Sequence, residues 1–128
     1  MTQEEAVGRW RKSAEENLQV ARDLMKLKHY DWALYMGQLV LEKLLKGLVT
    51  KNIDDAPPYT HDLKKLAEAA KLSLSSIQQN EFDEMTTYNI AARYASIKKK
   101  FYEKATKKYT EAWFGKIEEY VLWLNKKF

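Results

Sequence analysis

The stretch from His29 to Leu48 reads HYDWALYMGQLVLEKLLKGL and decides the fold class. Its apolar residues recur at steps of three and four and cover most of the circumference of a helix. Glu42, Lys43 and Lys46 are its only charged residues after Asp31. A helix this apolar belongs either at the centre of a bundle or under a second subunit. Asp31 is a candidate N-cap, so we expect this helix to begin there.

Helical patterns continue on the N-terminal side of this stretch. Thr2 and Glu5 have the spacing of a capping box, and apolar residues then recur with a helical period. This pattern predicts a first helix over residues 3–27. After the central helix, residues 52–58 contain two acids and two prolines, a composition that opposes helix and predicts a loop.

A third helix is expected after this loop. Thr60 is its candidate N-cap, with His61 and Asp62 in the first turn, where Asp62 suits the positive end of the helix dipole. The apolar stripe that follows predicts the core face of this helix. It consists of Leu63, Leu66, Ala67 and Ala70.

The C-terminal half of the chain predicts two more helices. A fourth helix is expected over residues 75–90, a connection over 93–96, and a long fifth helix from about residue 99. No segment alternates with a period of two. The sequence therefore predicts an all-α fold, an antiparallel up-and-down bundle of four to five helices in a single domain covering residues 1–128.

The composition excludes several classes of protein. The chain has no cysteine, so disulfides, thiolate metal sites and cysteine nucleophiles are absent. No apolar run reaches the roughly 18 residues that a membrane-spanning helix needs. The first residues are polar and acidic, unlike a secretory signal. These features favour a cytoplasmic protein.

Positive charge is concentrated at the end of the chain. Residues 1–97 carry 13 Lys and Arg against 14 Asp and Glu, whereas residues 98–128 carry 9 against 4. The segment 96–109 alone has six lysines interleaved with aromatic residues. Such a face can bind nucleic acid or can simply be a solvated helix surface. The spacing of Phe101 and Tyr109 around Ala105 favours a core stripe for these residues.

Metal and nucleophile sites have little support. His29 and His61 are the only histidines, and neither has the spacing of a metal motif. The acids Glu81, Asp83 and Glu84 are interpreted as part of a solvated helix face. Thr60 and its two successors are sequence neighbours, which is not the arrangement of a catalytic triad. We therefore predict no metal, no cofactor and no catalytic residue.

Three short motifs carry a family resemblance. They are the Glu42-Lys-Leu-Leu-Lys46 stretch of the central helix, Thr60-His-Asp-Leu63 and the pair Arg93-Tyr94. Their order and spacing in a helical chain of this length resemble the HEPN family of small helical domains. The resemblance covers nearly the whole chain, including the first helix. No single motif is specific, and the signal is their conjunction.

The resemblance implies a helical bundle that is commonly a homodimer and that interacts with nucleotides or nucleic acid. One branch of the family works with small nucleotidyltransferases, as a substrate-binding or regulatory partner. The candidate ligand-binding residues are Arg93, Tyr94, Lys43, Lys46 and His61. From its residue type alone, Arg93 suits a phosphate, but it is equally suited to capping the end of its own helix.

Another branch of the family consists of metal-independent ribonucleases with an Arg-x4-6-His motif near the later helices. Here no histidine follows Arg93. Arg22 and His29 match the spacing, but they lie at the end of the first helix, where the family does not place the motif. The leading expectation is a noncatalytic nucleotide-binding protein. The alternatives are a ribonuclease with an atypical active pair and a basic-face nucleic-acid-binding protein.

Overall fold

The computed structural model describes all 128 residues and contains six α-helices and no strand. The helices are α1 (Gln3–Lys26), α2 (Tyr30–Ile53), α3 (Leu63–Ala69), α4 (Ser76–Arg93), α5 (Ala95–Lys104) and α6 (Lys107–Asn125). The predicted all-α bundle is confirmed, with six helices in place of four to five. None of the six combines the length and the apolar composition needed to cross a bilayer.

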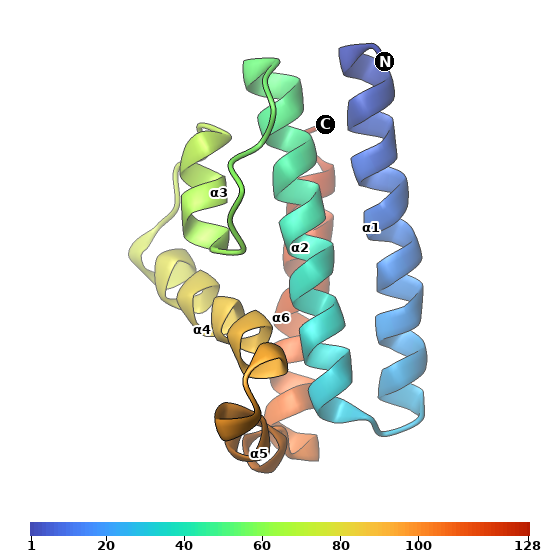
Figure 1. Ribbon diagram of the computed structural model, residues 1–128, viewed down its shortest axis with the longest axis vertical. Helices are drawn as coiled ribbons and strands as arrows, with labels where there is room; N and C mark the ends of the chain where they lie inside the picture. Colours follow the sequence, from blue (N-terminus) through green and yellow to red (C-terminus); the bar gives the residue numbers. More distant parts are fainter.

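The central element of the bundle is α2, which packs against α1, α3, α4 and α6. Figure 1 shows α1 running antiparallel along one side of α2, α3 and α4 on the other side, and α6 behind. Both termini lie at the same end of the bundle, and α5 lies at the opposite end. Most of the apolar circumference of α2 is therefore covered within one chain, which is the first of the two arrangements expected from its pattern.

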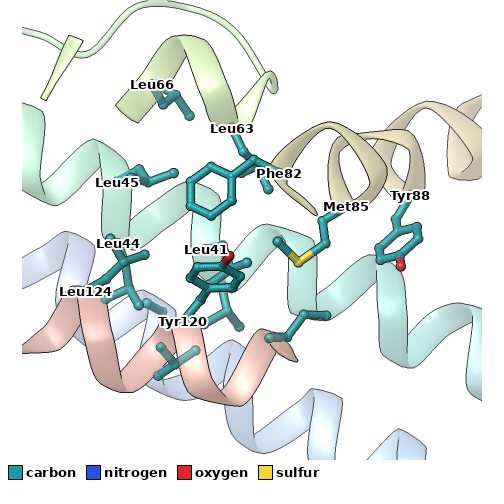
Figure 2. Close-up of a cluster of buried hydrophobic side chains, with 14 of the residues drawn as sticks. Leu41, Leu44, Leu45, Leu63, Leu66, Phe82, Met85, Tyr88, Tyr120 and Leu124 are labelled. Atoms are coloured by element: carbon teal, nitrogen blue, oxygen red, sulfur yellow. The ribbon is translucent and has the colours of Figure 1, made fainter. Parts of the chain in front are cut away.

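The core is formed where α3 and α4 meet α2 and α6. Phe82 of α4 is fully buried and packs edge-to-face on Tyr120 of α6, with ring centroids 5.0 Å apart. Figure 2 shows Phe82 lying between Tyr120 and the side chain of Leu63 from α3. The whole predicted apolar stripe of α3 is 0% exposed. These contacts fix the inclined α4 against the bundle.

The start of α2 differs from the prediction. The helix begins at Tyr30 with His29 as its N-cap residue, so Asp31 lies in the first turn and the prediction that it caps the helix is wrong. The Asp31 carboxylate accepts a bond from the backbone N–H of Trp32 instead. By contrast, Thr2 caps α1 as predicted, because its hydroxyl accepts from the backbone N–H of Glu5 at 3.0 Å.

The N-cap of α3 is Asp62, and the prediction of Thr60 is wrong. The Asp62 carboxylate accepts from the backbone N–H groups of Lys64 and Lys65 at 3.0 and 3.2 Å. The hydroxyl of Thr60 accepts from the backbone N–H of Asp62 and so stabilises the turn before the helix. His61 therefore lies outside the helix, in the last residues of the loop.

The segment expected as one fifth helix is two helices. Tyr94 alone separates α4 from α5, so the predicted connection over 93–96 is shorter than expected. Thr106 caps α6 by accepting from the backbone N–H of Tyr109 at 3.2 Å, and the chain turns there. Phe101 and Ala105 are 7% and 6% exposed, which confirms their predicted place in the core.

Two glutamates tie α4 to the C-terminal helices. Glu81 lies 2.7 Å from Lys116 and accepts from the hydroxyl of Tyr120 at 2.7 Å. Glu84 pairs with Lys104 at 2.6 Å and accepts from the hydroxyl of Tyr109. Both carboxylates are partly buried, so the interpretation as a solvated face is wrong for Glu81 and Glu84, whereas Asp83 is exposed as expected. These bonds hold α4, and with it Arg93 at its end.

Candidate functional site

A polar stripe runs along the otherwise apolar α2. Gln38, Glu42 and Lys46 are spaced by four residues and therefore lie on one face of the helix. Gln38 is 0% and Glu42 only 4% exposed. The Glu42 carboxylate accepts from the Gln38 amide at 3.2 Å and pairs with Lys46 at 3.0 Å. A buried carboxylate is tolerated here because polar partners surround it.

His61 joins this stripe from the loop before α3. Its Nδ1 lies 2.9 Å from Oε1 of Glu42, and its backbone carbonyl accepts from the Gln38 amide at 3.0 Å. Its Nε2 lies 2.5 Å from Nη2 of Arg93. A neutral imidazole with its proton on Nδ1 satisfies both contacts, since it donates to the carboxylate and accepts from the guanidinium.

Arg93 lies at the exposed edge of the network. It is the last residue of α4, and its side chain bonds to His61 and not to the carbonyls at the end of its own helix. No carboxylate forms an ion pair with it. A guanidinium has five N–H donors, so most of them still face solvent.

Asn89 connects Arg93's helix to the stripe. This residue is one turn before Arg93, is 1% exposed, and donates from its amide to Oε1 of Gln38 at 3.2 Å. The buried pair of amides fixes α4 on α2 at the level of the site. Sequence reasoning missed Gln38 and Asn89, although Gln38 precedes Glu42 by one helical turn in an apolar stretch.

The arrangement suits an anion at its outer edge. Lys46 is paired with Glu42, the only carboxylate of the network, whereas Arg93 has no carboxylate partner and carries uncompensated positive charge at the exposed edge. The buried Glu42 and Gln38 hold His61 in place, and the His61 imidazole in turn bonds to the Arg93 guanidinium. A guanidinium held in this way offers its remaining donors as a fork that fits a phosphate or carboxylate.

Three of the five predicted residues thus lie in one network: Arg93, His61 and Lys46. Lys43, which we expected in the same cleft, points to α1, where its Nζ donates to the hydroxyl of Ser13 at 2.6 Å. Tyr94 is 57% exposed in the link between α4 and α5, next to Arg93 in the chain.

The alternative pair is not assembled as a site. Arg22 forms an ion pair with Glu118 of α6 at 2.8 Å, and its side chain is about half exposed. His29 is exposed at the start of α2. No hydrogen bond joins the two side chains, and Arg22 is already neutralised by its partner.

The lysine-rich segment forms an exposed surface on α5. Lys98 lies over the Trp32 ring at 5.1 Å, and Lys104 is paired with Glu84. Lys99 and Lys100 are exposed and form no ion pair. This surface therefore keeps free cations close to the end of α4.

The fold and the site define a small all-helical domain with a buried polar network that ends in an exposed arginine. The family model for the HEPN domain matches residues 7–127, and the chain belongs to the HEPN family. Searches of curated proteins and of solved structures found no match. No group of three or more His, Asp or Glu side chains is arranged to hold a metal ion.

Proposed function

We propose that this HEPN protein binds a nucleotide or another phosphate-bearing ligand at Arg93 without cleaving it. The observation that carries the proposal is the state of Arg93: an exposed guanidinium with no carboxylate partner, held from behind by His61. An arginine with free donors and a fixed position is suited to bidentate binding of a phosphate. Lys46, the other cation of the network, is paired with Glu42 at 3.0 Å, so the uncompensated positive charge lies on Arg93.

The noncatalytic role is supported by the state of His61. A general base needs a free lone pair within reach of the proton that it removes. Here the lone pair of Nε2 already accepts from Arg93, and Nδ1 is bonded to Glu42. No histidine follows Arg93 in the sequence to replace it.

Calorimetry with ATP as the ligand tests this proposal. Arg93→Gln removes the charge and should weaken binding at least about tenfold. Arg22→Gln is the matched control, because it removes an arginine that is neutralised by Glu118, and it should leave the affinity unchanged. Equal affinity of the wild type and Arg93→Gln would overturn the assignment of the site.

We further propose that the protein acts with a small nucleotidyltransferase, as a substrate-binding or regulatory partner. Membership of the HEPN family and the absence of a histidine after Arg93 support this role. If the neighbouring reading frame encodes such an enzyme, co-expression should yield a complex that survives gel filtration. Separate elution of the two chains would contradict the partnership.

A homodimer is the proposed assembly of this chain. The supporting feature is the part of α2 that the bundle leaves open: Trp32 is 43% exposed, and Tyr35, Met36 and Leu39 are partly exposed on the same helical face. Light scattering at micromolar concentration should give the mass of a dimer for the wild type and of a monomer for Trp32→Gln. A monomeric wild type would count against it.

The second candidate function is a ribonuclease with an atypical active pair. It is favoured by the contact of Glu42 with His61, because a carboxylate that orients an imidazole is a common arrangement for acid–base chemistry. RNA cleavage by the wild type that is lost in His61→Ala would establish this function. Loss in both Arg22→Ala and His29→Ala, with His61→Ala active, would assign the other pair.

The third candidate is nucleic-acid binding by the basic face, supported by the unpaired Lys99 and Lys100. It predicts an affinity for single-stranded RNA that falls steeply with salt. Charge reversal of Lys98, Lys99 and Lys100 to Glu should abolish this binding. Binding that is indifferent to salt or to these substitutions would dismiss the candidate.

A further inference from the structure

A second cationic site lies between α1 and α2. A cavity of about 420 Å³ opens between the first turns of α1 and the middle of α2. It is lined by Met1, Ala6, Arg9, Trp10, Ser13 and Lys43. This volume lies in the range of small-molecule sites, which runs from about 300 to 1,000 Å³. Glu42, His61 and Arg93 do not line this cavity.

The ionisable side chains that line the cavity are both cations without a counter-ion. Lys43 is half-buried, and its Nζ has one partner, the hydroxyl of Ser13 at 2.6 Å. Arg9 is exposed at the rim. Neither forms an ion pair, and no acid lines the cavity. A partly buried charge is costly without a charged partner. Lys43 has only the neutral hydroxyl of Ser13 as a partner, so its positive charge is not compensated.

Trp10 gives the cavity an aromatic wall. Lys46 lies over its ring at 5.6 Å, and its Cβ stands close to Gly47 of α2, where a Cβ at position 47 would be only 3.1 Å away. Gly47 therefore lets α1 approach α2 at this level, which fixes the indole next to Lys43. A flat aromatic surface beside two free cations is complementary to a planar ring that carries a negative group.

We propose that this cavity binds a small aromatic anion, a planar ring that carries a phosphate or a carboxylate. The anionic group lies between Lys43 and Arg9, where it accepts from the ammonium and the guanidinium. The ring lies along Trp10. Ser13 keeps the Lys43 ammonium in place and can donate its own hydroxyl proton to the anion. Lys46 connects this site to the Arg93 network, because it lies over Trp10 and is paired with Glu42.

An NMR titration tests the proposal with phenyl phosphate and benzoate as ligands. Inorganic phosphate, which has the anionic group without the ring, and phenol, which has the ring without the anionic group, are the control ligands. The reporter is the indole N–H signal of Trp10, assigned from its absence in Trp10→Phe. At least one of the two aromatic anions should shift this signal saturably, and its affinity should be at least about tenfold higher than that of either control ligand. The aromatic anion that binds with the higher affinity identifies the preferred anionic group as phosphate or carboxylate.

Lys43→Gln should weaken this binding at least about tenfold, whereas Lys12→Gln, which removes an unpaired lysine of α1 outside the cavity, should not change it. Arg9→Gln is the second variant, because Arg9 is exposed and its loss leaves the fold intact. The proposal is overturned if neither aromatic anion shifts Trp10 up to about 10 mM. It is also overturned if both Lys43→Gln and Arg9→Gln bind like the wild type.

Discussion

Gly37 of α2 faces Ile117 of α6 so closely that no methyl group fits between them. A Cβ at position 37 would lie 2.7 Å from Cδ1 and 3.2 Å from Cγ2 of Ile117. Ile117 is 0% exposed. The absence of a side chain at Gly37 thus sets the distance between the two helices that form the centre of the bundle.

Gly37→Ala should lower the free energy of unfolding, because overpacking of the α2–α6 contact costs about 1–3 kcal/mol and outweighs the gain of about 0.5–1 kcal/mol that alanine gives within a helix. Gly115→Ala is the matched control: a Cβ there meets nothing within 4 Å, so it should stabilise by about 0.5–1 kcal/mol. Urea denaturation measures both. In Gly37→Ala, a second change of Ile117→Val removes Cδ1 and should recover part of the loss. Stabilisation by Gly37→Ala would show that the contact is not tight.

Removing one charge of the Glu42–Lys46 pair should destabilise the protein more than removing both charges. The two side chains are 6% and 14% exposed, so Glu42→Leu leaves an uncompensated ammonium and should cost about 3 kcal/mol in the free energy of unfolding. The double variant Glu42→Leu/Lys46→Met removes both charges and should recover more than half of that loss. Chemical denaturation measures the series. A double variant less stable than the single one would contradict the account.

Acid should weaken the attachment of α4 through Glu81. Partial burial alone raises the pKa of this carboxyl, but hydrogen bonds from Lys116 and Tyr120 and the charge of Lys116 outweigh it and hold the pKa below its ordinary value. A carboxyl whose pKa is lower in the folded state than in the unfolded state stabilises the folded protein at pH values above its unfolded-state pKa. This stabilisation is lost as the pH falls through the folded-state pKa.

We therefore expect the wild type to lose more stability than Glu81→Gln between about pH 5 and about pH 3. Urea midpoints at the two pH values, with Asp83→Asn as a control for an exposed carboxylate, give the comparison. Equal losses in the wild type and Glu81→Gln would show that the Glu81 contacts do not contribute to acid sensitivity.

Thr110→Val should stabilise the protein. Thr110 is 0% exposed, and its hydroxyl has no hydrogen-bond partner. Replacing it with a methyl group of the same shape removes a buried unsatisfied group, which is worth about 1 kcal/mol. Thermal unfolding measures the change, and Thr86→Val, which removes a hydroxyl bonded to the Phe82 carbonyl, should not stabilise. A lower melting temperature for Thr110→Val would contradict this reading.

The helices could be predicted from the sequence because their apolar residues repeat with a helical period. The ends were harder, since several residues compete for each cap. Thr60 and Asp62 are both good caps, and in the structure Asp62 caps α3 while the hydroxyl of Thr60 accepts from the backbone N–H of Asp62. The turn at Thr106 was missed because the apolar spacing of the lysine-rich segment continues across it.

The candidate site was predicted in part. Arg93 and His61 were identified from motifs, but their contact joins residues 32 positions apart and depends on the crossing of α4 over α2. Gln38 and Asn89 carry no motif, and only their burial and mutual hydrogen bond reveal them. Lys43 lies apart from this network and contacts Ser13 of α1. Adjacent positions of a central helix point to different neighbours, and the sequence does not identify which neighbour each position faces.

An NMR titration with pyrophosphate that follows the Nε–H signal of Arg93 and the ring nitrogens of His61 tests whether Arg93 binds phosphate. We expect saturable shifts at both side chains, because an anion bound to the guanidinium also changes the bond to Nε2 of His61. Shifts confined to Lys99 and Lys100, or the absence of any saturable shift, would contradict the assignment of Arg93 as the phosphate-binding residue.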